Sequence, residues 1–433
     1  MSDPRASAGQ FVKWGPYLAY GADPATTMTI TWRTKELADS GFVKYGKTPD
    51  CEQVAPEVSS EPVIVHMVKL DDLEPSTGYY YQISRDGSQT WEFTTGLPSG
   101  SREPFEFIIN GDMHAYPCND IGKYFNLMDE MAPEHSFYVG LGDFINDGVE
   151  ISHWNSFFHD AREYIAHRPL MNVPGNHDSD NPAKFANYEA AWGCTYPCAN
   201  PEWGAYYLLE YGNAVLFFID SCNGGRGAPL PSDEQLEWLE ENLKKYAKQD
   251  RWIFLFQHHQ VYSTGDFSCE RVAHDLFRPL CQEYHVDAMF YGHDHHYECF
   301  WVDRDEDWGG TLFVVAGAGC GQNHIDFGIM GDRSGQTKYV WPGRFLNVRK
   351  HGAPVPSANI TRGTLASRMD ELVQESQLVG VLEPNFVSIH IDGDVIDLKC
   401  IGWQKQVYHH LRVERAGAGR RWDPSCELAI VDY

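Results

Sequence analysis

Residues 137–147 are Phe-Tyr-Val-Gly-Leu-Gly-Asp-Phe-Ile-Asn-Asp, a short apolar run that ends abruptly in Gly142 and Asp143. The run predicts a buried strand, and the glycine predicts the turn at which the strand ends. Open α/β sheets bind ligands beyond the carboxyl ends of their strands, and one carboxylate has two oxygens for two metal ions. Asp143 is therefore a candidate bridging ligand, although an isolated Gly-Asp pair more often only opens a turn.

Four further apolar runs end in polar side chains that can bind metal ions. The runs and the residues that follow them are 105–110 with Asp112 and His114, 169–173 with Asn176, His177 and Asp178, 252–256 with His258 and His259, and 286–291 with His293 and His295. Asp112, Asp143 and Asn176 follow one another at intervals of 31 and 33 residues, about the length of one βαβ unit. We therefore expect five strand ends that present Asp, Asn and His.

The ordered set resembles the calcineurin-like metallophosphoesterases, whose pattern is D-x-H, G-D, G-N-H-D/E, a lone His after a strand, and G-H-x-H. All five blocks are present, and the resemblance covers residues 105 to about 403. The ordered set is highly specific, whereas D-x-H or G-H-x-H alone would be weak. The resemblance implies a four-layer α/β/β/α domain over 105–403, in which two stacked sheets are flanked by helices.

The resemblance also implies a centre of two metal ions. By residue-for-residue match, one ion is held by Asp112, His114 and His295 and the other by Asn176, His258 and His293, with Asp143 shared between them. Mixed carboxylate, amide and imidazole ligands suit iron, manganese, zinc or cobalt. Such a pair lowers the pKa of a bound water, so that hydroxide attacks phosphorus in line.

His177 follows a predicted ligand directly and would face the leaving group, to which it would donate a proton. Asp147 or Asp178 would orient its ring through the other nitrogen. Asn176 and His177 would also contact the phosphoryl group.

Three further features are candidates for substrate contact. His259 would either support a ligand or bind phosphate, and Arg226, in a Gly-Gly-Arg-Gly turn, would clamp a phosphate unless it lies in a plain surface turn. Residues 322–355 contain five basic and two acidic residues with interleaved aromatics. This loop would contact an anionic substrate, or alternatively form a subunit interface in a homo-oligomer.

The N-terminal part predicts an all-β domain over 14–98, after a flexible tail at 1–13. Residues 28–33 and 63–70 alternate apolar with polar side chains, as half-buried strands do. Residues 73–79 are Leu-Glu-Pro-Ser-Thr-Gly-Tyr and resemble the L-x-P-x-T-x-Y segment of fibronectin type III sandwiches. That resemblance implies that the Tyr79 hydroxyl bonds nearby backbone as a tyrosine corner.

A fibronectin-like sandwich before a metallophosphoesterase is the arrangement of plant-type purple acid phosphatases, so the whole chain is predicted to be α+β. One position departs from that family. Purple enzymes have G-D-x-x-Y, whose tyrosine binds ferric iron, whereas this chain has Asn146 there. Iron is therefore not required, and a purple protein is not implied.

Helices are expected between the metal motifs. Ser232 and Gln235 fit a capping box that opens a helix to about residue 248. Residues 322–385 interrupt the last strands, and apolar positions from 365 to 379 have helical spacing. Residues 404–433 are treated as a C-terminal extension without a functional signal.

Composition limits the possible partners. The chain has 433 residues and a net charge of −27, which argues against coating nucleic acid or an anionic membrane surface. The sequence contains no apolar run of membrane-spanning length and does not start with a signal peptide. We expect a soluble protein, cytoplasmic or, if a leader has been removed, secreted. Cys194 and Cys198 are the closest of the 11 cysteines, and a loop disulfide between them has no support.

The leading hypothesis is a phosphoric ester hydrolase that acts on a small phosphorylated substrate, with a monoester preferred because of the N-terminal sandwich. A phosphodiesterase on small or cyclic nucleotides is the alternative, because both reactions use the same ligands. A third hypothesis is a binding module with an inactive phosphoesterase fold, although a relic of that kind would be expected to have lost ligands.

Overall fold

The structure is a computed structural model that describes residues 14–422 with internal gaps. The gaps are at 60, 85–88, 118, 120, 180–185, 193–195, 197–198, 200–205, 223–229, 264–270, 320–345, 349–376, 382–383 and 417–418. Arg226, Cys194 and Cys198 lie outside the described residues, as does the loop 322–355 except for three residues. Among the described helices, none is both long and apolar enough to span a bilayer.

The N-terminal domain is a sandwich of two antiparallel sheets. The first sheet has the order β1 (Trp14–Ala19), β2 (Met28–Ala38) and β5 (Val63–Leu70). The second has the order β4 (Gln53–Pro56), β3 (Phe42–Gly46), β6 (Gly78–Ile83) and β7 (Trp91–Thr94). The predicted tyrosine corner is confirmed, because the Tyr79 hydroxyl accepts a hydrogen bond of 2.9 Å from the backbone N–H of Glu74.

Two large sheets form the centre of the second domain. The first has the order β10 (Leu170–Asn172), β9 (Phe137–Gly140), β8 (Phe105–Asn110), β19 (Asn385–Asp392), β20 (Val395–Gly402), β21 (Val407–Ala416) and β22 (Gly419–Trp422). The other has the order β11 (Tyr207–Tyr211), β12 (Ala214–Phe218), β13 (Trp252–Gln257), β14 (Ala288–Tyr291), β16 (Thr311–Ala316), β15 (Tyr297–Val302), β18 (Gln377–Val381) and β17 (Leu346–Val348).

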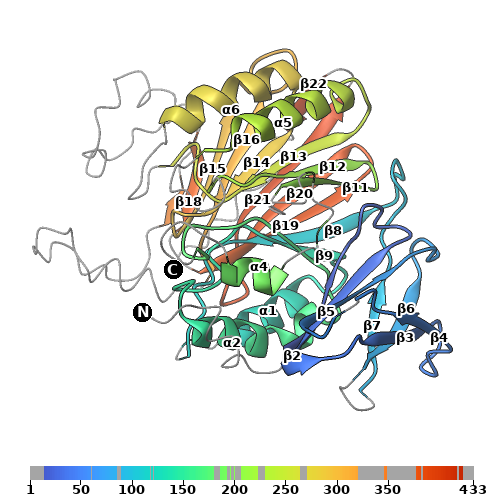
Figure 1. Ribbon diagram of the computed structural model, residues 1–433. Helices are drawn as coiled ribbons and strands as arrows, with labels where there is room; N and C mark the ends of the chain where they lie inside the picture. Colours follow the sequence, from blue (N-terminus) through green and yellow to red (C-terminus); the bar gives the residue numbers. More distant parts are fainter. Residues whose placement is uncertain are drawn as a thin grey trace, which may run out of the picture.

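Helices cover the outer faces of both sheets, which confirms the predicted four layers (Figure 1). The helices are α1 (Gly122–Met131), α2 (Ile151–Asp160), α3 (Arg162–Ile165) and α4 (Ala186–Trp192) on the side of the first sheet, and α5 (Asp233–Tyr246) and α6 (Arg271–Tyr284) on the second. The inner faces pack through aromatic rings, since Phe107 of β8 lies edge-on to Phe254 of β13 at 6.0 Å between centroids.

The parallel strands explain where ligands can gather. β8, β9 and β10 run parallel in one sheet, and β12, β13, β14 and β16 run parallel in the other. All five strands predicted before the polar blocks are present. Their carboxyl ends lie at one edge of each sheet, which is where open α/β sheets bind ligands.

The sandwich packs against the helices of the second domain. The Tyr81 hydroxyl donates a hydrogen bond of 2.7 Å to the carbonyl of Ala166, and the Tyr17 hydroxyl donates one to the carbonyl of Ala191. Both contacts bury polar groups with partners at the domain interface.

The structure differs from the sequence predictions at three places. Residues 377–379, the end of the proposed helical stretch, lie in strand β18 and not in a helix, because β18 pairs with β15 at the sheet; residues 365–376 lie outside the described residues. The first sheet continues past residue 403 into β21 and β22. Ser232 caps α5 as predicted, but the Gln235 side chain bonds the backbone N–H and carbonyl of Asp220 at 2.7 and 3.0 Å instead of completing a capping box.

Candidate metal centre

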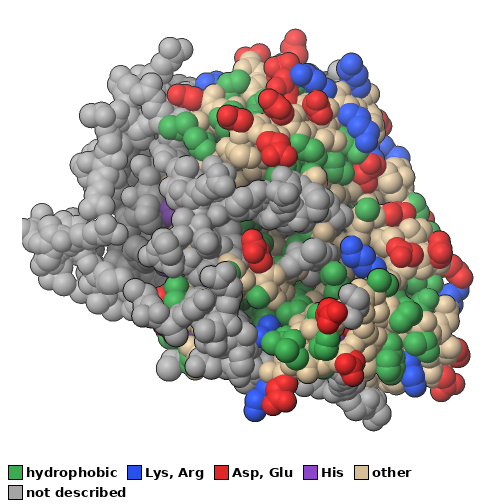
Figure 2. Space-filling model, viewed as in Figure 1, with side chains coloured by type: hydrophobic (Ala, Val, Ile, Leu, Met, Phe, Trp, Pro, Cys, Tyr) green, Lys and Arg blue, Asp and Glu red, His purple; other side chains and the backbone are tan. Residues whose placement is uncertain are grey.

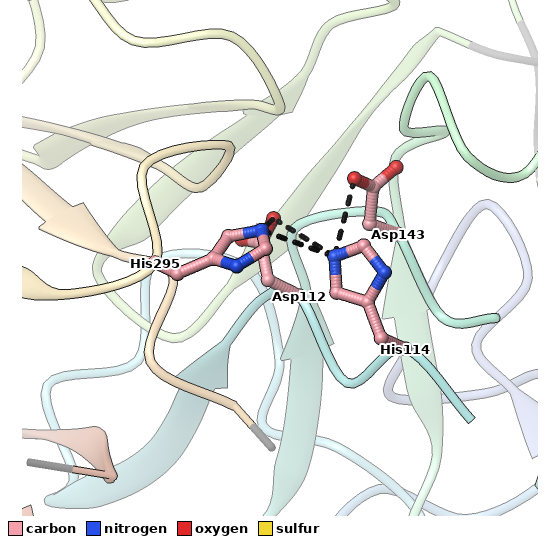
Figure 3. Close-up of side chains that lie close together, drawn as sticks. All are labelled: Asp112, His114, Asp143 and His295. Atoms are coloured by element: carbon pink, nitrogen blue, oxygen red, sulfur yellow. Dashed lines mark hydrogen bonds and ion pairs between the residues drawn. The ribbon is translucent and has the colours of Figure 1, made fainter. Parts of the chain in front are cut away.

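The first group of ligand atoms comes from both sheets. Asp112, His114, Asp143 and His295 each present one atom, and these atoms lie within 4.8 Å of one another (Figure 3). The Nε2 atoms of His114 and His295 are 3.1 Å apart, and His295 Nε2 is 3.3 Å from Asp112 Oδ1. This group contains the three residues predicted for one ion together with the shared Asp143.

The second group shares Asp143 with the first. Asp143, His258 and His293 present ligand atoms within 4.8 Å of one another. Asn176 Oδ1 is 3.0 Å from His258 Nε2, and His293 Nδ1 is 3.3 Å from the same nitrogen. The structure thus brings together all four residues predicted for the second ion, and Asp143 belongs to both groups.

One buried carboxylate oxygen shows that this donor set fits metal ions. Asp143 Oδ2 is buried and accepts no hydrogen bond within the described structure. It lies 3.6 Å from His114 Nε2 and 3.4 Å from His258 Nε2. Burial of an ionised oxygen without a hydrogen bond is costly, and a cation between Asp143 and each imidazole would satisfy it. Carboxylate, amide and imidazole donors are the set that first-row metal ions prefer.

Burial and charge set the protonation of the ligands. Burial alone would raise the pKa of Asp143, but the neighbouring His258 outweighs it and holds that pKa well below the ordinary value. Burial works against the charged form of His258 too, yet the Asp143 carboxylate raises its pKa to about 9. Burial lowers the pKa of His114 to about 4 and that of His293 to about 3. Neutral imidazole is the form that binds a metal.

Backbone groups orient the ligands. His258 Nδ1 donates a hydrogen bond of 2.8 Å to the carbonyl of Leu141, so its Nε2 faces the site, as is usual for histidine ligands. The backbone N–H of His293 donates to Asp112 Oδ2 at 2.9 Å. The first sheet therefore orients the ligand His258 of the second sheet, and the second sheet orients the ligand Asp112 of the first.

Four predicted ligands have left-handed backbone. The φ angles are +59° at Asp112, +44° at His114, +53° at Asp143 and +67° at His293. Residues other than glycine in such conformations cost about 1–3 kcal/mol each and gather at functional sites. Glycine is required nearby, because a Cβ on Gly175 would clash with the backbone and carboxylate of Asp143.

Comparison with known families agrees with this geometry. The model of the calcineurin-like phosphoesterase family matches residues 105–297, and that of the purple acid phosphatase N-terminal domain matches residues 14–95. The chain therefore contains a calcineurin-like phosphoesterase domain, which follows an N-terminal domain of the purple acid phosphatase kind.

Its relatives include purple acid phosphatases of plants. It is 25% identical to purple acid phosphatase 21 of Arabidopsis thaliana, over 71% of this chain and 69% of that protein. It is also 25% identical to the probable inactive purple acid phosphatase 24 of the same plant, over 69% of this chain but only 56% of that relative. A purple acid phosphatase from yellow lupin (Lupinus luteus) seeds shares the fold with a TM-score of 0.69 and 19% identity, covering 94% of this chain and 75% of that one.

His177 of this domain lies beside the first ligand group. Its ring packs edge-on to His114, with 4.7 Å between centroids, and its Nδ1 lies 2.8 Å from the carbonyl oxygen of Asn146. Burial opposes the charged form, but the Asp143 carboxylate and that carbonyl raise the pKa of His177.

The prediction that Asp147 or Asp178 orients His177 is wrong. The orienting acceptor is the Asn146 carbonyl, whereas the Asp147 side chain is exposed and accepts from the backbone N–H of Val149. Asp178 is buried and accepts hydrogen bonds from backbone N–H groups. Burial and the Asp143 charge raise the pKa of Asp178, and the backbone N–H groups that donate to its oxygens oppose this rise.

His259 lies next to the second ligand group, and its tautomer follows from Ser221. The Ser221 oxygen accepts from the backbone N–H groups of His258 and His259 at 3.3 and 3.0 Å. Both lone pairs are then occupied, so its own proton goes to His259 Nδ1 at 3.0 Å,. His259 therefore has its proton on Nε2, and its ring lies 4.7 Å from that of His293. Burial, together with the positive charge of His258, lowers the pKa of His259 well below the ordinary value.

Ser221 is a residue of the candidate site that the sequence analysis did not identify. It follows β12, which is the parallel neighbour of β13, so it lies at the same sheet edge as His258. An Asp-Ser pair after an apolar run was the available signal.

Proposed function

We propose that the chain hydrolyses phosphoric esters at a dinuclear metal centre, with a small phosphomonoester as substrate. The observation that supports this most directly is the Asp143 oxygen that two ligand groups share without a hydrogen bond. One carboxylate between two sets of three further donors is the arrangement expected for a metal pair that acts on phosphorus.

Iron, manganese, zinc or cobalt ions in this site would activate a water molecule and neutralise charge on the phosphoryl oxygens. Asp112 and Asp143 keep their charge because their pKa values lie below the ordinary range. His114 and His293 are neutral and ready to bind an ion. His258, whose pKa is raised to about 9 by Asp143, must release its proton when an ion binds,.

His177 is the proposed proton donor to the leaving oxygen. The Asn146 carbonyl accepts its Nδ1–H, so Nε2 is the nitrogen left for the substrate. The raised pKa of His177 favours the protonated form that a general acid requires,. Asn146 stands where purple enzymes have a tyrosine, and the absence of a purple colour stays a prediction.

His259 is proposed to bind a phosphoryl oxygen. Since Ser221 fixes its proton on Nε2, the ring offers a neutral N–H donor beside His293. A preorganised donor of this kind stabilises negative charge that develops during phosphoryl transfer. Asn176 is proposed to share this contact, and Arg226 remains a candidate outside the described residues.

The exterior does not attract an anionic substrate. The net charge is −27, and Figure 2 shows acidic side chains over the upper part of the described surface, where α5 and α6 lie. Attraction must therefore come from the site, where cations would outweigh the two carboxylates.

Turnover of nitrophenyl phosphate and of its bis ester by the metal-loaded protein tests the proposal. We expect hydrolysis of both to depend on metal, with the monoester preferred, because the N-terminal domain is of the purple acid phosphatase kind. Preference for the bis ester would instead favour a phosphodiesterase. Full metal occupancy without turnover of any ester would favour a binding module, and one relative is described as probably inactive.

A further inference from the structure

Asp178 has a set of contacts that its predicted role does not explain. Its side chain is fully buried. Oδ2 accepts from the backbone N–H groups of Asp143 and Gly175 at 2.8 and 2.9 Å. Oδ1 accepts from those of Phe144 and Ile145 at 2.9 and 3.4 Å. A carboxylate has about four acceptor positions and no donor, so these N–H groups fill its capacity.

The successive N–H groups of residues 143–145 form an anion-binding nest. Such nests in other proteins bind phosphate or other external anions. Here the anion is a side chain of the neighbouring loop, 35 residues along the chain from Asp143. The first N–H group of the nest belongs to Asp143, whose φ of +53° is unfavourable without support,.

The contact between the two loops is reciprocal. Asp143 Oδ1 accepts a hydrogen bond of 2.7 Å from the backbone N–H of His177, while Asp178 accepts from the backbone of Asp143. Each loop therefore binds the backbone of the other with one carboxylate. Because Oδ1 of Asp143 is engaged by this bond, Oδ2 is the oxygen left to face His114 and His258.

We propose that Asp178 is a positioning residue, which holds the loops 143–145 and 175–178 together so that Asp143 can bridge two metal ions. It acts through Asp143 and does not touch the substrate. The inference rests on the metal centre of the proposed function, but not on turnover or on the choice of substrate.

The variant Asp178→Asn tests this role. Asparagine offers one acceptor oxygen, and its NH2 group would face two of the four N–H donors. Two of the four hydrogen bonds to the backbone are therefore lost. We expect the affinity for Mn²⁺ or Zn²⁺, measured by equilibrium dialysis with elemental analysis, to fall by about 10–100-fold, the usual effect of losing a group that supports a ligand. Peptides that contain residues 143–145 should exchange their amide hydrogens faster, while β20 stays protected.

Asp287→Asn is the matched control. Asp287 is also buried, and its Oδ2 accepts a hydrogen bond of 2.7 Å from the backbone N–H of Ile253, at the opposite end of β13 from the ligand His258. Its replacement should lower stability without a change in metal affinity. Equal losses of metal affinity in both variants would mean that Asp178 is a general structural aspartate, and would overturn the proposal.

A second test uses the metal-free wild type, so it does not require that a variant folds. If Asp178 orders the loop, the amides of residues 143–145 are protected before any metal binds. Rapid exchange that slows only with metal would assign the ordering to the ion and overturn the proposal, as would unchanged affinity and protection in Asp178→Asn. A wild type that binds two ions without turnover would contradict the proposed hydrolase and leave this result standing.

Discussion

The two sheet edges that meet at the site differ in what they supply. The edge of the first sheet provides the oxygen donors Asp112, Asp143 and Asn176, together with His114. Among the described ligands, those at the edge of the second sheet are imidazoles, from His258, His293 and His295. Either edge alone would present an incomplete site, so packing of the two sheets is a condition for metal binding.

The edges also differ in how the chain holds its ligands. On the first, carboxylates bind backbone N–H groups across loops, as Asp178 does for Asp143. On the second, backbone carbonyl and hydroxyl groups hold imidazole nitrogens, as Leu141 does for His258 and Ser221 does for His259. A carboxylate accepts only, so it needs donors around it, whereas a neutral imidazole has one N–H and one acceptor nitrogen. His258 therefore takes an acceptor at Leu141 and His259 takes a donor at Ser221,.

The largest effect is expected at Asp143, the one ligand that belongs to both groups. Asp143→Ala should lose both ions and reduce activity to background, whereas His114→Ala should mainly empty one site. Elemental analysis of the two purified variants measures this difference. Two ions retained in Asp143→Ala would show that the groups do not share a bridge.

His177 should come next, because it touches the site without being a metal ligand in this arrangement. His177→Asn should keep both ions but lower kcat by about 10²–10⁴, as expected for loss of a positioned proton donor. An alkyl phosphate should suffer far more than nitrophenyl phosphate, because nitrophenolate leaves without a proton. Equal losses on both substrates, at unchanged metal content, would exclude a general acid and leave phosphate binding as its task.

The sequence was sufficient for those features in which a strand and a polar residue adjoin along the chain. An apolar run followed by Asp, Asn or His located the five strand ends, and the tyrosine at 79 located the corner of the sandwich. Local pattern decides such features, since strand burial and turn chemistry act over a few residues.

The missing features depend on contacts between distant segments. The role of Asp178 needs the knowledge that its loop lies against residues 143–145, and that of Ser221 needs the order of strands in the second sheet. Val379 lies in a strand because pairing at a sheet outweighs a short helical spacing,. β21 is the exception among the missing features, because it has a local signal: His409, Leu411 and Val413, at alternate positions, are buried.

The contact between the two sheets should depend on pH, because it contains a buried histidine. His409 of β21 is fully buried, with its Nδ1 2.6 Å from the Tyr297 hydroxyl of β15. Burial lowers the pKa of His409 to about 3. In the unfolded state its pKa is near 6.5, so as the pH drops the unfolded state binds the proton before the folded state does. The free energy of unfolding therefore falls between about pH 6.5 and pH 3, and at pH 5 the loss is about 2 kcal/mol.

His409→Phe removes this titration. Its free energy of unfolding in urea, measured without metal, should fall less between pH 7 and pH 5 than that of the wild type, by about the same 2 kcal/mol. His159→Gln is the control, because the His159 side chain is 85% exposed. Equal slopes for wild type and His409→Phe would contradict a neutral His409 between the sheets.

The smallest effect is expected at Ser221, the support of the imidazole edge. Ser221→Ala should keep both ions, because the Leu141 carbonyl still orients His258, but the proton of His259 is then free to move to Nδ1. Inhibition by inorganic phosphate should weaken by about tenfold, the low end for a hydrogen bond to a charged group. Ser156→Ala is the control, since its hydroxyl only bonds the carbonyl of Ser152 within α2.

A double variant decides whether Ser221 acts through His259. His259→Gln alone should weaken inhibition by phosphate at least as much as Ser221→Ala does. The combined variant should show the same inhibition by phosphate as His259→Gln, because the hydroxyl has no imidazole left to orient. Groups that act as one unit are not additive in such a cycle. If the two losses add, the serine and the histidine act separately. In that case the edge of the second sheet holds His259 in place without fixing which ring nitrogen has the proton. The two edges would then differ in packing alone.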